Sequence, residues 1–165
     1  MKTSHEQFML LALKEAKKAQ EKNEVPIGCV IVKDEKVVSA AHNARECKNN
    51  SLAHAEILAI NKACENLGSW RLCGCTLYVT LEPCPMCMGA IINSRIDTVC
   101  FGTSDEKAGC CGSVADFNEF HFNHKPLIIR NVCKTECAGL LSDFFLALRL
   151  KKQEKIKATS QKDNL

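Results

Sequence analysis

A β-prone segment that ends at a proline and leads directly into a helical segment is the strongest structural pattern in the chain. Residues 76–80 (TLYVT) are typical of a buried strand, Pro83 ends it, and residues 84–92 have the pattern of a short helix. Residues 28–32 and 36–40 predict a hairpin, because an Asp-Glu turn joins two apolar, β-branched runs. The chain therefore contains both antiparallel strands and a strand–helix unit.

Helical and strand patterns alternate over the rest of the chain. Alternation of this kind predicts an α/β fold with one sheet covered on both faces, and the hairpin makes that sheet mixed. The further segments that carry these patterns are helices over 4–22, 53–67 and 138–156, and strands over 98–101 and 127–129.

Length and composition indicate one folded domain. The chain has 165 residues, is 46% hydrophobic and carries a net charge of only +3, which argues against global disorder. No run approaches the roughly 18 apolar residues of a membrane span, and no leader segment is recognisable. We expect a single domain over residues 1–157 and a frayed basic tail over 158–165.

Cysteine usage indicates a reducing compartment. Twelve cysteines are more than usual, but the chain is longer than a typical disulfide scaffold and shows no secretory signal. We therefore expect a cytoplasmic protein with reduced thiols, most of which pack as small hydrophobic side chains.

The positive charge is concentrated at one end. Six Lys and Arg against two acidic residues give 149–165 a charge of +4 and leave −1 for residues 1–148. The segment is either a solvated helix end or a contact for a polyanion such as nucleic acid.

A metal site is predicted from His54, Cys84 and Cys87. The two cysteines are three residues apart at a predicted helix start, so they share one face, and the helix dipole favours their thiolates. Two thiolates and one imidazole suit Zn²⁺, and three protein ligands leave one position open for water. Glu56 is then the natural proton carrier. Since residues two apart on a helix point in different directions, we expect His54 at or near the helix start.

A closed structural zinc site is the alternative for the same cysteines. Cys73 and Cys75 would complete a four-cysteine set with Cys84 and Cys87. The intervening strand over 76–80 argues against it, because a strand rises about 3.3 Å per residue and separates its two ends.

Several stretches resemble the zinc-dependent nucleobase deaminases of the cytidine/deoxycytidylate deaminase superfamily. Within it, the chain is most similar to the bacterial tRNA-specific adenosine deaminases, which convert the wobble adenosine of an anticodon to inosine. The stretches that carry this resemblance are 24–28 (EVPIG), 53–56 (AHAE), 80–84 (TLEPC), the Gly-rich segment from Phe101 to Ser113, and 137–145 (CAGLLSDFF).

The resemblance implies a fold, an assembly and an activity. The fold is a three-layer α/β/α cytidine-deaminase-like arrangement with a mixed five-stranded sheet, and the protein is a homodimer with one zinc ion per subunit. The activity is hydrolytic deamination of the wobble adenosine in a tRNA anticodon stem-loop, without a membrane partner. The basic segment near Arg149 then becomes an RNA contact.

The resemblance also implies roles for individual residues. His54, Cys84 and Cys87 hold the zinc ion, and Glu56 moves protons to the adenine ring and the leaving amine. Asn43 hydrogen-bonds the flipped base, although its spacing also suits a plain turn residue. The residues implied to contact flanking nucleotides are Asp105, Lys107, Phe145 and Arg149. Two other functions stay open: a deaminase of free guanine or cytosine, and a zinc-stabilised module without catalysis.

Overall fold

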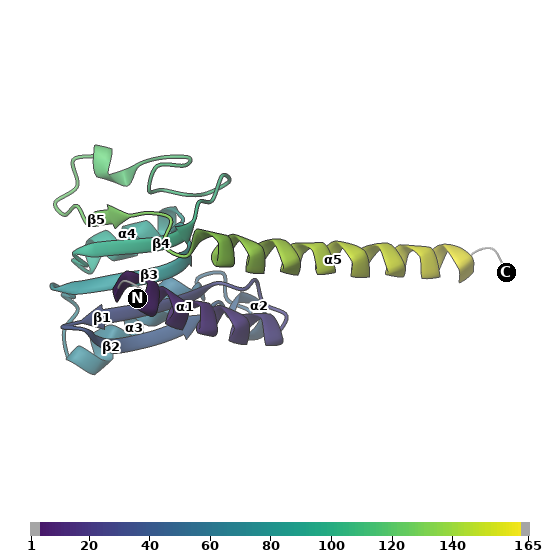
Figure 1. The fold of residues 1–165 in the computed structure, drawn as a ribbon, viewed down its shortest axis with the longest axis horizontal. Coiled ribbons are helices and arrows are strands. Elements are labelled where there is room, and N and C mark those ends of the chain that lie inside the picture. The colour runs from purple at the N-terminus through teal and green to yellow at the C-terminus, as the bar shows by residue number, and fades with distance from the viewer. Residues whose placement is uncertain (1–3, 163–165) are drawn as a thin grey trace.

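The computed structural model describes residues 4–162 as one sheet with helices on both sides (Figure 1). Part of the expected tail, 163–165, lies outside the described residues. The elements are α1 (Ser4–Glu21), β1 (Gly28–Lys33), β2 (Lys36–His42), α2 (Arg45–Lys48), α3 (Ala55–Leu67), β3 (Cys75–Leu81), α4 (Pro85–Asn93), β4 (Thr98–Thr103), a 3₁₀ turn η1 (Phe117–Glu119), β5 (Leu127–Ile129) and α5 (Lys134–Lys162).

The sheet is five-stranded and mixed, with the order β2-β1-β3-β4-β5. Strand β1 pairs antiparallel with both β2 and β3, whereas β4 runs parallel to β3 and to β5. Each parallel connection passes through helix α4 or through the segment that contains η1. The mixed five-stranded sheet implied by the family resemblance is therefore confirmed.

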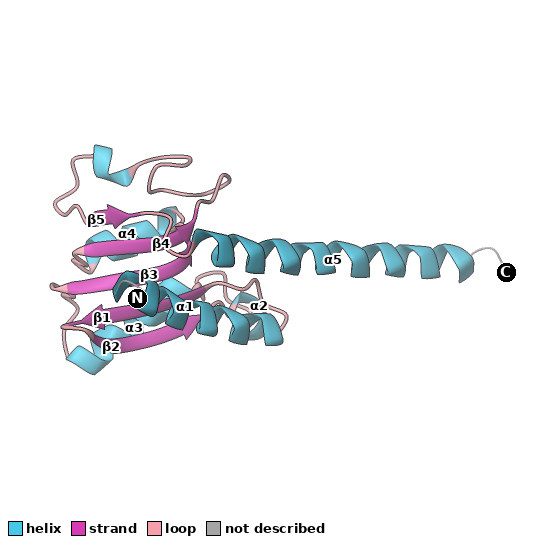
Figure 2. Ribbon diagram, viewed as in Figure 1, coloured by secondary structure: helices cyan, strands magenta, loops and turns pink. Residues whose placement is uncertain are grey.

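Two cores on opposite faces of the sheet give the fold three layers (Figure 2). Since successive strand residues point to opposite faces, Ile31 packs with α3 and α4, while its neighbour Val30 packs with α1. Helix α1 lies so close to β1 that a Cβ on Gly28 would stand 2.0 Å from the carbonyl oxygen of Ala12. Only glycine fits at that contact.

Helix α5 starts on the sheet and extends well beyond it (Figure 1). Its 29 residues span about 43 Å at the usual helical rise. The sequence predicted only 138–156; the backbone is helical from Lys134 and continues through 158–162, part of the expected tail. Among residues 4–162, no helix combines the length and the apolar character needed to cross a membrane.

Candidate active site

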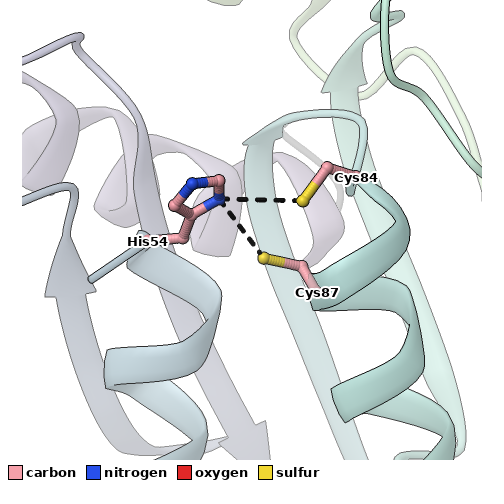
Figure 3. A group of neighbouring side chains, drawn as sticks. All are labelled: His54, Cys84 and Cys87. Atoms are coloured by element: carbon pink, nitrogen blue, oxygen red, sulfur yellow. Dashed lines mark hydrogen bonds between the residues drawn. The ribbon is translucent and has the colours of Figure 1, made fainter. Parts of the chain in front are cut away.

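Two helix N-termini meet at the site and bring three ligand-type side chains together (Figure 3). His54 is the N-cap residue of α3, with extended backbone angles of φ −74° and ψ 152°. Cys84 is the N-cap residue of α4, three residues after the end of β3, and Pro85 begins that helix with its φ already fixed near the helical value. Cys87 lies one turn further along α4. The expected position of His54 at the helix start is confirmed.

The three side chains have the spacing of a metal site. The Nδ1 atom of His54 lies 3.7 Å from the Cys84 sulfur and 3.6 Å from the Cys87 sulfur. A tetrahedral zinc ion with ordinary bond lengths to nitrogen and sulfur would place these atoms about 3.5 Å apart. One ligand atom from each of the three residues lies within 4.8 Å of the others. The donor set and its spacing therefore fit a metal ion such as zinc.

The electrostatics of the cluster favour a bound cation. A hydrogen bond from Cys87 lowers the pKa of the Cys84 thiol to about 4; burial opposes this shift, and His54 adds to it. The same hydrogen bond, together with burial, raises the pKa of Cys87. The contact with Cys84 also raises the pKa of His54. The cluster thus holds an anionic thiolate at neutral pH, as a cation site requires.

Glu56 lies in the first turn of α3, two residues after His54, and its side chain is buried. Burial is the main cause that raises the pKa of Glu56 to about 7, with a further increase from the charge of Cys84. A hydrogen bond with Cys87 and the charge of His54 act in the opposite direction. A carboxyl group with a pKa near neutrality can both accept and donate protons at physiological pH.

These residues open into a cavity of about 240 Å³. Its wall contains His54, Glu56, Cys84 and Asn43, together with apolar side chains such as Val25 and Ile27. The volume is below the roughly 300–1,000 Å³ typical of drug-sized ligand sites. A small cavity that combines a proton carrier with apolar lining side chains suits one flat heterocycle.

Asn43 follows β2 and is fixed in the cavity wall by its own amide. Its Nδ2 atom donates to a carboxylate oxygen of Glu24 and to the carbonyl oxygen of Val25, each at 3.4 Å. Glu24 is buried and also accepts a hydrogen bond of 2.6 Å from the backbone N–H of Cys47. Because both of its acceptors belong to the protein, the amide of Asn43 is oriented before any ligand arrives.

Comparison with known proteins gives the same family from sequence and from structure. A family model described as MafB19-like deaminase matches residues 3–149. A tRNA-specific adenosine deaminase of Bacillus subtilis (strain 168) is 51% identical over 160 residues, which cover 96% of this chain and 99% of the relative. The chain belongs to the tRNA-specific adenosine deaminase family.

Solved structures extend the comparison to the fold of this deaminase. One solved structure comes from biochemical and structural studies of A-to-I editing by tRNA:A34 deaminases at the wobble position of transfer RNA. Its sequence is 43% identical to this chain, and the two structures superpose with a TM-score of 0.80. That match covers 82% of this chain and 99% of the other. A guanine deaminase from Bacillus subtilis is 39% identical with a TM-score of 0.58 and covers 61% of this chain and 64% of its own. The cytidine-deaminase-like fold is thereby confirmed.

The residues expected to contact flanking nucleotides divide between two neighbouring cavities of this deaminase. Asp105 lines the cavity that holds Glu56. Lys107, Phe145 and Arg149 line a second, open cavity of about 340 Å³, together with Leu141 and Ser142 of α5. The Phe145 side chain is 41% exposed, whereas Phe144 is half-buried beside it. The structure thus brings together three residues that the sequence separates by up to 42 positions.

The four-cysteine alternative is not supported by the arrangement of residues 4–162. Cys75 begins β3 and Cys84 follows its far end, and the described metal-type cluster includes neither Cys73 nor Cys75. None of the twelve cysteines forms a disulfide bond in the described structure. Eight of them are buried or half-buried outside the cluster and pack as apolar side chains: Cys29, Cys64, Cys75, Cys100, Cys110, Cys111, Cys133 and Cys137.

Sequence reasoning missed two buried carboxylates beside the cavity. Glu24 fixes Asn43, and Glu82 also lines the cavity. Glu24 precedes an apolar stretch and Glu82 follows one, and the residues directly beside them in the sequence carry no charge that would indicate a functional site. A glutamate directly before the Pro83-Cys84 pair was the available signal for Glu82.

Proposed function

We propose that this chain hydrolyses the wobble adenosine of a tRNA anticodon to inosine and ammonia, with one zinc ion per subunit. The observation that carries the proposal is the single cavity in which the buried Glu56 lies beside the His54, Cys84 and Cys87 cluster. The family to which the chain belongs supports the substrate. Inside an anticodon loop the base is already unpaired, which reduces the cost of extruding it into a pocket.

Zinc held by His54, Cys84 and Cys87 would supply a Lewis acid that lowers the pKa of water to about 7. Glu56 takes a proton from the attacking water, which adds to C6 of adenine. The same carboxyl delivers that proton to N1 and then carries the remaining proton of the added hydroxyl to the amine, so that the C6–N bond breaks, a C6 carbonyl forms and ammonia leaves. Its raised pKa, about 7, suits a group that must carry protons in both directions.

The remaining cavity residues hold and enclose the base. Asn43 has its amide nitrogen committed to Glu24 and Val25, so its carbonyl oxygen is available to accept a hydrogen bond from the base. Val25 and Ile27 give apolar contact with the ring faces and exclude water from the reacting atoms.

Flanking nucleotides would lie in the second cavity. Lys107 and Arg149 supply positive charge for phosphates, and the exposed ring of Phe145 offers a surface on which a base can stack. The lysines further along α5 extend the positive charge away from the body. A site for a free base has no need of this second cavity.

Deamination of free guanine is the second candidate, because a guanine deaminase of Bacillus subtilis shares 39% identity over part of the chain. Incubation of the purified protein with an anticodon stem-loop and, separately, with free guanine or cytosine distinguishes the two. We expect inosine from the stem-loop and no ammonia from the free bases. Ammonia from the free base alone would favour the second candidate.

We further infer that the protein is a cytoplasmic homodimer. The family resemblance supports the dimer, and twelve cysteines without a disulfide bond in the described structure support a reducing compartment. Light scattering on the purified protein is expected to give about twice the 18.3 kDa of one chain.

A further inference from the structure

A buried carboxylate organises one wall of the active site. Glu82 directly follows β3 and is only 2% exposed. No lysine, arginine or histidine among residues 4–162 forms an ion pair with it. All the partners that the structure gives its carboxylate are N–H and O–H groups of one segment, residues 105–113. We call residues 105–113 the wall segment.

Both carboxylate oxygens of Glu82 are used. One accepts hydrogen bonds from the backbone N–H groups of Cys111, at 2.8 Å, and Ser113, at 3.2 Å. The other accepts from the N–H of Asp105, at 3.0 Å, and from the Ser113 hydroxyl. These hydrogen bonds reach both ends of the wall segment, so the Glu82 side chain holds the two ends in place.

The middle of the wall segment also lies directly against this carboxylate. A Cβ on Gly109 would stand 2.4 Å from a carboxylate oxygen of Glu82 and 2.7 Å from the carbonyl oxygen of Asp105. Any side chain at position 109 would therefore push the segment away. The N–H of Cys110 donates to the carbonyl oxygen of Pro83 at 2.9 Å, which adds a second anchor.

Residues of the wall segment line both cavities. Asp105 and Ala108 line the cavity that holds Glu56, and Lys107 lines the second cavity beside Phe145 and Arg149. The side chain of Asp105 accepts from the N–H groups of Lys107, at 2.9 Å, and Ala108, at 3.3 Å. A shift of Asp105 therefore moves both of these residues.

We propose that Glu82 is a positioning residue for RNA: it holds the wall segment so that Asp105, Lys107 and Ala108 meet the nucleotides around the target base. The inference rests on the proposed function and adds to it a determinant of substrate binding. Glu82 contributes to binding through the segment it holds, and the proton transfers remain with Glu56.

Glu82→Gln tests this with almost no change in volume. The amide oxygen of glutamine can face the two N–H groups of Cys111 and Ser113, but its NH₂ group then faces the N–H of Asp105, and two donors cannot pair. We expect KM for an anticodon stem-loop to rise about tenfold because the Asp105 anchor is lost. The kcat value should stay within about twofold, because the chemical groups are unchanged.

Gly109→Ala displaces the same segment without substituting Glu82 or any position next to Cys84 in the sequence. It should therefore reproduce the rise in KM. Gly139→Ala in α5 is the matched control, because a Cβ there meets no atom within 4 Å, and it should behave as the wild type. Ser113→Ala, which deletes one donor to Glu82, carries the test if Glu82→Gln does not fold.

Zinc content is measured on every variant, because Glu82 is two residues from Cys84. A higher KM with normal zinc in both Glu82→Gln and Gly109→Ala supports the proposal. An unchanged KM, or a loss of zinc or kcat in Glu82→Gln while Gly109→Ala behaves as the wild type, overturns it. If the wild type turns over no RNA at all, the proposed function itself has failed.

Discussion

The Nδ1 atom of His54 and the sulfur of Cys87 lie 3.6 Å apart, although 33 positions separate the two residues in the chain. The contact exists because the N-termini of α3 and α4 lie side by side (Figure 3). A metal ion bound between them would join the two helices as well as serve the chemistry.

Replacing Cys87 with serine should remove the metal. Loss of one of three protein ligands weakens zinc binding strongly, so we expect the purified variant to hold less than about a tenth of the wild-type zinc. Metal analysis after gel filtration measures this. The control is Cys73→Ser, an exposed cysteine outside the cluster, which should keep its zinc. Zinc loss from the Cys73 variant would instead support a four-cysteine site.

Replacing Glu56 with glutamine should abolish proton transfer while preserving the fold. The amide has similar size but cannot take up and release a proton at neutral pH, so kcat should fall by about 10²–10⁴-fold or more. Single-turnover assays with a stem-loop RNA give the rate, and metal analysis shows whether zinc is kept. The matched control is Glu46→Gln, an exposed glutamate of α2. A Glu56→Gln variant with zinc and normal activity is incompatible with the assigned role.

The second cavity can be tested through α5. Phe145→Ala removes the exposed ring and should weaken RNA binding by roughly 1–3 kcal/mol, the usual contribution of one stacked base. Arg149→Ala should make the plot of log affinity against log salt concentration less steep, by the amount that corresponds to the loss of about one phosphate contact. Fluorescence anisotropy over a salt series measures both. Leu146→Ala, an exposed neighbour outside this cavity, should bind as the wild type, and equal losses in all three variants would contradict the assignment.

The residues that form the candidate site could be predicted from the sequence, but the residues that hold the surrounding segments in place could not. His54, Glu56, Cys84 and Cys87 occur in short local patterns at helix starts, and such patterns can be recognised without any tertiary information. Glu82 binds residues 23 to 31 positions away, and no periodicity marks a contact of that range. The short helix α2 was missed for the same reason, because a four-residue helix is stabilised here by the distant Glu24.

Glu24 predicts a dependence of stability on pH. Burial alone would raise the pKa of its carboxyl, but hydrogen bonds from the backbone of Cys47, Glu46 and Arg45 lower it overall, below the ordinary value of 4.5. A lowered pKa in the folded state means that the carboxylate stabilises the fold above pH 4.5. That contribution is lost as the pH falls through the folded-state pKa.

Glu24→Gln should therefore unfold about 1–3 kcal/mol more easily than the wild type at pH 7, because the donors around position 24 lose a charged acceptor. The difference should shrink steadily as the pH is lowered from 4.5 toward 3. Urea unfolding at each pH measures it, and any loss of zinc in acid affects both proteins alike. A difference that is constant with pH would show that the charge of Glu24 does not stabilise the fold.

The proposed substrate is the wobble adenosine of a tRNA anticodon. The direct measurement is inosine formation in two tRNAs that differ only at the wobble position, adenosine in one and guanosine in the other, each with wild-type protein and with Glu56→Gln. The wild type, and not Glu56→Gln, should form inosine at the wobble position of the adenosine tRNA. Equal inosine in the guanosine tRNA, or none in either, would contradict the proposed function.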